Sequence, residues 1–236
     1  MINNKTILAI IPSRSGSKGI KNKNIKKLNG IPLLSRTIRE VKESLFIDEV
    51  VVSTDSNKIA SLAISENINV PFIRPKAISK DNSTSQDVIL HTLKWFKSNK
   101  NTFDLFIYLQ PTSPFRTRFH IDESLKLFVE NNDADSLVSV KAVSEHPLWM
   151  KTIRKSGLIS NYINSEKVAS SRQGLPEVFL LNGAIYISNC KSFMRYKSFY
   201  ERNCLSYIMD NHSSLDIDTH EDWKYAEYLE LNSSDN

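Results

Sequence analysis

Three short, continuous apolar runs constrain the fold of this chain most strongly. They are residues 6–12 (TILAIIP), 49–54 (EVVVST) and 103–110 (FDLFIYLQ). Unbroken apolar runs of this length are typical of strands buried on both faces, as in a parallel sheet. Each run is followed by a polar loop and then by a segment of helical periodicity. This alternation predicts an α/β fold with a doubly wound, mostly parallel sheet.

The remaining elements continue this alternation. We expect helices over about 33–45, 58–67 and 84–97. A fourth helix is indicated by an apolar stripe at Ile121, Leu125 and Phe128, and a last helix by a capping box at Thr219–Asp222. Further strands are expected at 69–73, 136–140, 183–188 and 215–218.

Residues 141–178 break the pattern. The stretch is irregular and polar, and it is too long for a plain loop in a compact domain. We therefore predict one domain over residues 1–236, with 141–178 forming a small protruding lobe.

Several classes of protein are excluded by composition. No apolar stretch approaches the roughly 18–20 residues of a membrane span. The start of the chain has no signal-peptide pattern, so we expect a cytoplasmic protein. Two cysteines and five histidines without metal-ligand spacing argue against a disulfide framework and a zinc site.

The net charge of +5 is concentrated in one loop that follows the first apolar run. Its six cations, with no acid between them, are Arg14, Lys18, Lys21, Lys23, Lys26 and Lys27. Gly16 and Gly19 allow the backbone to approach a ligand, and exposed amides there can form an anion nest. Such a compact basic loop favours a nucleoside triphosphate over a nucleic acid, which needs a wider basic face. The simpler alternative is a solvated basic turn.

Asp216-Ile217-Asp218 is the strongest acidic feature. On a strand, alternation would place both carboxylates on one face, with their Cα atoms about 6.6–6.8 Å apart. A hard divalent cation would relieve their repulsion. The alternative is a polar helix entry in which Asp218 and Thr219 serve the following cap.

Other polar clusters are open to two interpretations. Gln110, Thr112, Ser113 and Arg116 lie in a proline-rich turn after the third apolar run and suit a polyhydroxylated ligand, although such turns are common. For Asp81, Ser83 and Ser85 we favour N-capping of the helix at 84. Asn182-Gly183 fits a bulge or turn, and Arg172 fits a surface arginine.

Taken together and in this order, these segments resemble the acylneuraminate cytidylyltransferases, the CMP-sialic acid synthetases. The motifs are IPSRSGSKGIKNKNI (11–25), VVSTDS (51–56), RPKAISKDNSTS (74–85), LQPTSPFRT (109–117), HPLW (146–149), RQGLP (172–176), NGAIYI (182–187) and DIDT (216–219). They cover nearly the whole chain. The resemblance implies a Rossmann-like, three-layer nucleotidyltransferase fold.

The resemblance also implies the activity: transfer of CMP from CTP to the anomeric hydroxyl of a nine-carbon sialic-type acid, with Mg²⁺ or Mn²⁺ and release of pyrophosphate. The nucleotide-binding residues would be Arg14, Ser15, Gly16, Lys18, Lys23, Asn24, Arg74, Asp81 and Ser85. The sugar-binding residues would be Gln110, Thr112, Ser113, Arg116, Lys151, Arg172, Asn182 and Tyr186. Asp216 and Asp218 would hold the metal and, with Lys18 and Arg14, form the catalytic group.

In the family the irregular lobe is a dimerisation element, so the resemblance implies a homodimer, with no nucleic-acid or membrane partner. The chain departs from the family pattern at Leu180-Leu181, where Arg-Pro is common. It departs again at Trp149, where a lysine is common and Lys151 is a substitute. Both positions lie toward the sugar, so legionaminic, pseudaminic and 3-deoxy-octulosonic acids stay open as acceptors. A metal-dependent nucleotide-sugar glycosyltransferase and a basic RNA-binding protein are the more distant alternatives.

Overall fold

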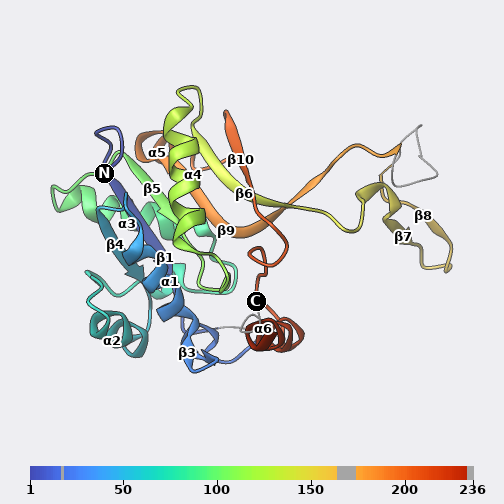
Figure 1. Ribbon diagram of the computed structural model, residues 1–236, viewed down its shortest axis with the longest axis horizontal. Coiled ribbons are helices and arrows are strands. Elements are labelled where there is room, and N and C mark those ends of the chain that lie inside the picture. Colours follow the sequence, from blue (N-terminus) through green and yellow to red (C-terminus); the bar gives the residue numbers. More distant parts are fainter. Residues whose placement is uncertain (17–18, 164–173, 233–236) are drawn as a thin grey trace.

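The computed structural model describes residues 1–16, 19–163 and 174–232, which are organised around a six-stranded sheet (Figure 1). The strands lie in the order β10-β6-β9-β5-β1-β4. Their bounds are β1 (Ile7–Pro12), β4 (Glu49–Ser53), β5 (Leu105–Tyr108), β6 (Ser136–Ala142), β9 (Phe179–Asn189) and β10 (Cys204–Ile208). β1 is parallel to β4 and β5, and β10 is parallel to β6, whereas β9 runs antiparallel between β5 and β6. The predicted α/β fold with a mostly parallel sheet is confirmed.

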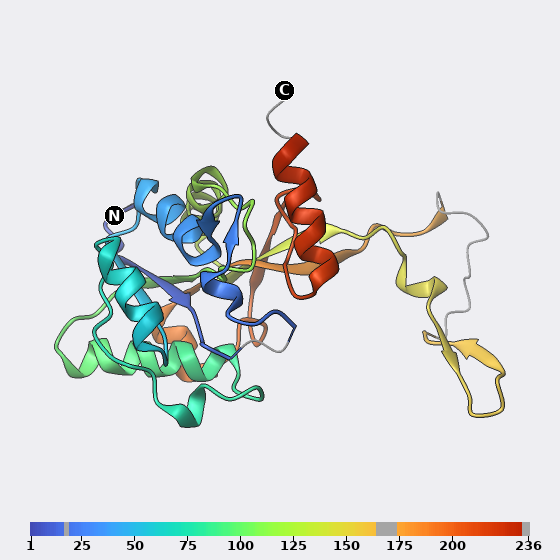
Figure 2. The ribbon, with the colours of Figure 1, turned by 90° about the horizontal axis from the view of Figure 1, so that it is seen from below.

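Helices cover both faces of the sheet, as the side-chain alternation along β1 requires (Figure 2). Ile7, Ala9 and Ile11 pack in one hydrophobic cluster with α1, α2 and α4, while Leu8 and Ile10 pack in a second with α3 and α5. Because both faces are covered, β1 is apolar throughout. The bounds are α1 (Leu33–Glu43), α2 (Asn57–Ser65), α3 (Ser85–Ser98), α4 (Arg118–Glu130) and α5 (Cys190–Tyr196).

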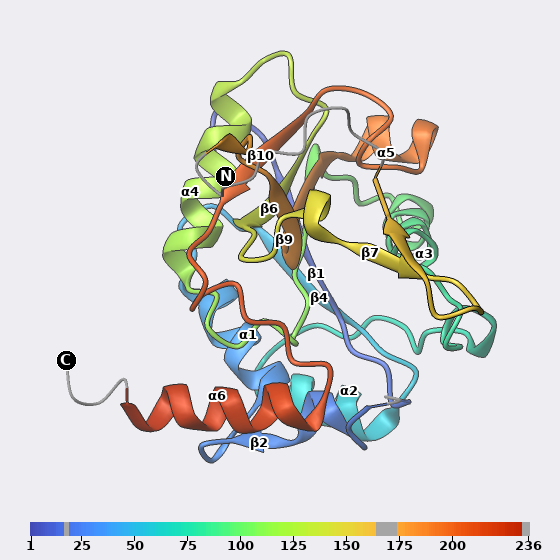
Figure 3. The same ribbon diagram turned by 90° about the vertical axis from the view of Figure 1, so that its right-hand side faces the viewer.

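A third hydrophobic cluster joins the two ends of the sequence. The last helix, α6 (His220–Asn232), lies along the short hairpin of β2 (Lys27–Leu28) and β3 (Ile31–Pro32) (Figure 3). Trp223 and Ala226 of α6 pack with Ile20, Leu28 and Ile217. The segment before α6 is therefore held against the loop that follows β1.

The start of α6 carries the predicted capping box. The Asp222 amide donates to Thr219 Oγ1 at 3.2 Å, and Asp222 Oδ2 accepts from the amides of Thr219 and Asp218 at 2.7 and 3.0 Å. One carboxylate thus caps the helix and holds the backbone of Asp218.

Two predicted strands are absent from the described residues. Segment 69–73 makes only isolated bridges, from Asn69 to Val51 and from Ile73 to Thr54. Segment 215–218 forms no strand because it crosses the end of the sheet and its Ile217 amide donates to the Thr112 carbonyl at 2.9 Å. Alternation still operates there, since Ile217 is buried while Asp218 is exposed.

Beyond β6 the chain leaves the body as an arm and returns at the start of β9 (Figure 1). The arm contains the single turn η3 (Pro147–Trp149) and an antiparallel pair, β7 (Lys151–Ile153) and β8 (Ile159–Asn161). It exposes several large apolar side chains, including Ile153, Leu158, Ile159 and Tyr162. A protruding segment was predicted here from the irregular sequence alone.

Candidate active site

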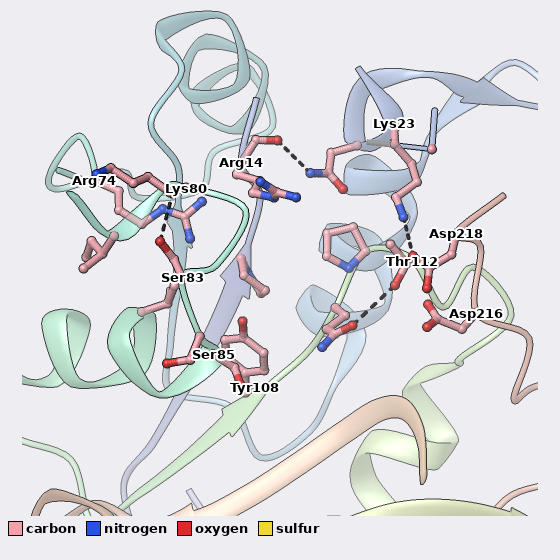
Figure 4. A pocket seen from close by; sticks show the side chains of 18 residues that line it. Arg14, Lys23, Arg74, Lys80, Ser83, Ser85, Tyr108, Thr112, Asp216 and Asp218 are labelled. Atoms are coloured by element: carbon pink, nitrogen blue, oxygen red, sulfur yellow. Dashed lines mark hydrogen bonds and ion pairs between the residues drawn. The ribbon is translucent and has the colours of Figure 1, made fainter. Parts of the chain in front are cut away.

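A cavity of about 560 Å³ opens at the carboxyl ends of β1 and β5 (Figure 4). This edge is where open α/β sheets bind ligands. Its lining comes from the loop after β1, the loop between η2 (Lys76–Ile78) and α3, the turn after β5 and the segment before α6. The lining residues are Pro12, Arg14, Gly19, Lys23, Asn24, Arg74, Ile78, Lys80, Ser83, Thr84, Ser85, Val88, Tyr108, Gln110, Pro111, Thr112, Asp216 and Asp218.

The basic loop is tied down on both sides of its glycines. Ser15 donates through its amide and its hydroxyl to the Asp55 carboxylate, both at 2.8 Å. Asn24, in the single turn η1 (Lys23–Ile25), donates to the Arg14 carbonyl at 3.1 Å. The Arg14 guanidinium pairs with Asp81 at 2.6 Å. These contacts hold Arg14 and Lys23 on the wall of the cavity.

The two aspartates lie beside Lys23 of this loop and differ in environment (Figure 4). Asp218 is exposed, and its Oδ1 lies 2.8 Å from Lys23 Nζ. The side chain of Asp216 is largely enclosed, and its Oδ1 has no hydrogen-bond partner among the described residues. Burial, together with the neighbouring charge of Asp218, raises the pKa of Asp216 above its ordinary value. Lys23 therefore offsets one of the two carboxylate charges at this side of the cavity.

Gly19 makes this close approach possible. A β-carbon placed there would overlap the main-chain carbonyl oxygen of Asp218 and lie 3.3 Å from its carbonyl carbon. The loop after β1 and the segment before α6 thus touch backbone to backbone. Residues with a side chain at position 19 would force them apart.

A buried arginine forms the opposite wall. Arg74 is 4% exposed, and its Nε and Nη2 have no partner among the described residues. Burial lowers the pKa of Arg74 below the ordinary value for arginine; the charge of Arg14 adds to this effect, and the charge of Asp55 opposes it. Unsatisfied buried N–H groups of this kind call for an acceptor oxygen from a ligand.

Comparison with known proteins identifies the family at this point. A family model described as "Cytidylyltransferase" matches residues 8–233. The chain belongs to the cytidylyltransferase family. Among its relatives is an N-acylneuraminate cytidylyltransferase of Streptococcus agalactiae serotype V, 35% identical over 218 residues; these cover 92% of this chain and 51% of that protein. The chain therefore spans about half the length of the Streptococcus relatives that it matches.

A second relative has nearly the same length. The CMP-N,N'-diacetyllegionaminic acid synthase of Legionella pneumophila is 36% identical over 230 residues, which cover 96% of this chain and 97% of that protein. A solved CMP:2-keto-3-deoxy-manno-octonic acid synthetase, complexed with CTP, superposes with a TM-score of 0.73 at 15% identity over 97% of this chain and 99% of that one. At that identity the superposition shows the shared cytidylyltransferase fold.

The structure brings many of the predicted site residues together. Those that line the cavity are Arg14, Lys23, Asn24, Arg74, Ser85, Gln110, Thr112, Asp216 and Asp218. Lys18 and Arg172 lie outside the described residues. Asp81 is not in the lining but is the ion-pair partner of Arg14, and the capping box of α3 is formed by Thr84 and Asp87 instead.

Two residues predicted to bind sugar are buried structural groups instead. The Arg116 guanidinium, 1% exposed, donates to the carbonyls of Gln110 and Ala184 and to Thr37 Oγ1 at 2.9–3.0 Å. Asn182 accepts from Ser139 Oγ and donates to Ser214 Oγ. Their polar atoms are enclosed and, apart from Arg116 Nε, hydrogen-bonded within the protein, and neither residue lines the cavity. We correct both assignments.

Four other predicted residues lie outside the cavity lining. Ser113 is buried, Ser15 is bound to Asp55, and Gly16 lies in the same loop. Lys151 is on the arm, where its Nζ donates to Asn161 at 2.6 Å, so it does not reach the cavity of its own chain.

Tyr186 is not in the lining either but stands behind it. Its ring packs edge-on against Tyr108 at 6.3 Å, and burial, with the nearby charges of Tyr200 and Asp216, raises the pKa of Tyr186 to about 12. It is therefore a neutral phenol that backs the carboxylate side of the site.

Sequence reasoning missed Lys80 and Tyr108. Lys80 lies in the RPKAISKD motif, and its amide donates to Ser83 Oγ at 2.9 Å (Figure 4). Tyr108 is the last residue of β5 and belongs to an otherwise apolar run. The basic character of the RPKAISKD loop could have indicated Lys80, but no local signal distinguishes Tyr108 from a core residue.

The carboxylate pair fits a divalent cation. The unpartnered Asp216 Oδ1 and the adjacent Asp218 offer hard oxygen ligands, which suit Mg²⁺. Among the described residues no group of three His, Cys, Asp or Glu could hold a metal. Mg²⁺ commonly takes one or two carboxylates and completes its shell with water and substrate phosphates. The residues present match that mode.

Proposed function

We propose that this protein transfers a cytidylyl group from CTP to the anomeric hydroxyl of a nine-carbon sialic-type acid, N-acetylneuraminate, and releases pyrophosphate. One observation carries the proposal: a single cavity joins the cationic loop after β1 to the carboxylate pair before α6. Membership of the cytidylyltransferase family supports CTP as the nucleotide.

The nucleotide would lie between the two basic walls. Arg14, Lys23 and Asn24, with Lys18 from the same loop, supply donors and positive charge for the triphosphate. Arg74 and Ser85, opposite them, would receive the cytidine, since the free Arg74 N–H groups require an acceptor oxygen. Gln110 and Thr112 lie beside the carboxylates and would meet the sugar acid.

The reaction is an in-line attack of the sugar hydroxyl oxygen on the α-phosphorus. A new P–O bond forms, the bond to pyrophosphate breaks, and the hydroxyl proton passes to a carboxylate. Both reactants are anionic, so catalysis is mainly positioning and charge neutralisation by Arg14 and the lysines.

Asp216 and Asp218 would hold Mg²⁺ or Mn²⁺ at the boundary between nucleotide and sugar. A bound divalent ion supplies charge neutralisation at the phosphate oxygens and favours ionisation of a nearby hydroxyl. Within this chain, the task of the two carboxylates would be to hold that charge beside the cationic loop.

The acceptor has a second candidate. The Legionella relative, which has nearly the length of this chain, is named for N,N'-diacetyllegionaminic acid, another nine-carbon sugar acid. Legionaminate is therefore the acceptor to compare directly with N-acetylneuraminate, with pseudaminate and 3-deoxy-octulosonate completing the panel.

The test is pyrophosphate release from each nucleoside triphosphate with Mg²⁺ and each sugar acid. We expect release with CTP and a nine-carbon acid, and loss of turnover in Asp218→Asn with folding intact. Normal release by that variant would contradict the assigned role of the carboxylate. Binding of a nucleoside-diphosphate sugar without pyrophosphate release would favour a glycosyltransferase instead.

We also propose that the arm joins two copies of the chain, and that the dimer works in the cytoplasm, where CTP is available. The support is the exposed apolar surface of the arm, because contiguous exposed apolar patches mark contact sites. Light scattering on Ile159→Glu, in β8, should give a monomer where the wild type gives a dimer. An unchanged mass would remove this strand from the interface. No helix among the described residues is long and apolar enough to span a membrane.

A further inference from the structure

We propose that Lys23 acts as a resident counterion that excludes divalent metal from the carboxylate pair until a triphosphate draws it away. Metal and nucleotide would then enter the cavity together, and neither would bind well alone. This inference rests on the proposed function, since it takes Asp216 and Asp218 as the metal-holding residues.

The position of Lys23 is the first observation. Its Nζ lies 2.8 Å from Asp218 Oδ1 and 2.6 Å from the Ile217 carbonyl oxygen, and its side chain is only 11% exposed (Figure 4). The main-chain bond fixes the ammonium beside the carboxylate. Lys23 is therefore not one of the loosely held partners that make surface ion pairs weak.

The charge balance of the pair is the second observation. With Asp216 ionised, the two carboxylates carry two negative charges, and Lys23 cancels one of them. A divalent ion bound to Asp218 would meet the Lys23 ammonium at short range, and like charges at such distances repel strongly in a partly enclosed site. Metal binding without nucleotide must therefore work against Lys23.

The reach of Lys23 is the third observation. The same side chain lines the cavity together with Arg14 and Asn24, where the triphosphate would lie. A lysine ammonium is a compact charge on a flexible stem, so it can exchange one anionic partner for another over a short distance. A phosphate oxygen would take the place of Asp218, which would leave the carboxylate free for the metal.

Such an exchange couples the two ligands in both directions. By linkage, whatever factor the nucleotide adds to metal affinity, the metal adds to nucleotide affinity. A purely structural Lys23, which only joined η1 to the segment before α6, would lower stability when replaced but would not raise metal affinity. The sign of the change in metal affinity therefore separates the two roles.

The experiment is a titration of the full chain with Mn²⁺ alone, followed by the electron paramagnetic resonance signal of free Mn²⁺. In Lys23→Met, which keeps the length and apolar stem of the side chain, we expect Mn²⁺ to bind at least about tenfold more tightly than in the wild type. CTP affinity in EDTA, measured by calorimetry, should fall in the same variant. Opposite changes in the two affinities are the expected signature.

Lys26→Met is the matched control. Lys26 lies three residues away, and its Nζ sits 3.9 Å over the Trp223 ring rather than in the cavity. It removes the same charge from the same loop, so its Mn²⁺ affinity should stay near that of the wild type. An equal gain in both variants would show a general charge effect and overturn the role of Lys23.

Mn²⁺ affinity in Lys23→Met that is equal to or weaker than in the wild type also overturns the inference. Lys23→Gln, which keeps a hydrogen-bond donor toward Ile217, repeats the test if the methionine variant does not fold. The proposed function fails separately, if the wild type releases no pyrophosphate from CTP with any acid of the panel. The Mn²⁺ titration decides the role of Lys23 in either case.

Discussion

Gly19→Ala tests whether backbone contact between the loop after β1 and the segment before α6 builds the site. The added methyl would overlap the Asp218 carbonyl oxygen, which is main chain and cannot rotate away. Relieving the overlap to ordinary contact requires the two segments to separate by about 1 Å. Asp218 and Lys23 lie on those segments, so the carboxylate moves relative to the cationic wall.

A misplacement of about 1 Å can cost about 10²-fold in rate, equivalent to about 2.7 kcal/mol in the activation free energy. We therefore expect kcat for pyrophosphate release to fall by about two orders of magnitude. Overpacking of this kind also costs about 1–3 kcal/mol of folding free energy. At about 2–4 °C per kcal/mol for a chain of this size, Tm should fall by several degrees.

Gly16→Ala is the comparison for stability, because a methyl at that position would lie 3.9 Å from Arg14 Nη1, an ordinary contact. Its Tm should remain near that of the wild type. If Gly19→Ala keeps kcat within about threefold of the wild type and melts at the same temperature, the two segments do not need their close approach, and the reasoning is wrong.

Three further outcomes follow from the site. In EDTA, Asp216→Asn should raise Tm at pH 7, because the pKa of Asp216 is raised in the folded state and folding therefore disfavours the ionised carboxylate. The gain in Tm should vanish as the pH falls below about 4, where the carboxyl is protonated in both the folded and the unfolded state. Asp222→Ala should lower the free energy of unfolding in urea by about 1 kcal/mol, because the helix cap is lost. It should also lower kcat, because the Asp218 amide loses its hydrogen-bond acceptor. A loss of stability with unchanged kcat would limit Asp222 to capping. Arg116→Met should lower the free energy of unfolding in urea by at least about 3 kcal/mol, because three buried acceptors lose their hydrogen-bond donor. Unchanged stability with a raised KM for the sugar acid would instead assign Arg116 to the sugar site.

The fold was largely predictable because its signals are local. The apolar run of β1 reflects a strand buried on both faces, and the apolar stripe of α4 reflects a helix buried on one face. Any sheet covered by two layers of helices requires both patterns. The capping box at Thr219–Asp222 is also local, since both partners lie within one turn of helix. Segment 215–218 was mistaken for a strand because an extended backbone has the same alternation whether or not it pairs with a neighbour.

The roles of individual polar residues were less predictable. Arg116 and Asn182 have the residue types of ligand-binding groups, but both are buried, and residues distant in the sequence take their hydrogen bonds, apart from Arg116 Nε. Tyr108 shows the reverse, because a strand residue of the core also lines the cavity. Whether a polar side chain finds hydrogen-bond partners within the protein, and whether it is exposed, depends on its neighbours in space. Those neighbours come from distant parts of the chain.

The sequence by itself determined the main strands and helices from β1 to β6, the density of charge in one loop and the presence of paired carboxylates, because each is a property of neighbouring residues. Only the tertiary structure decided that β9 enters antiparallel between β5 and β6, and that Lys23 meets Asp218 across nearly the whole length of the chain. That meeting depends on the packing of α6 against the residues that follow β1 and on a glycine small enough to let two backbones touch. Contacts of this range are settled by the shape of the packed chain, and no local pattern encodes them.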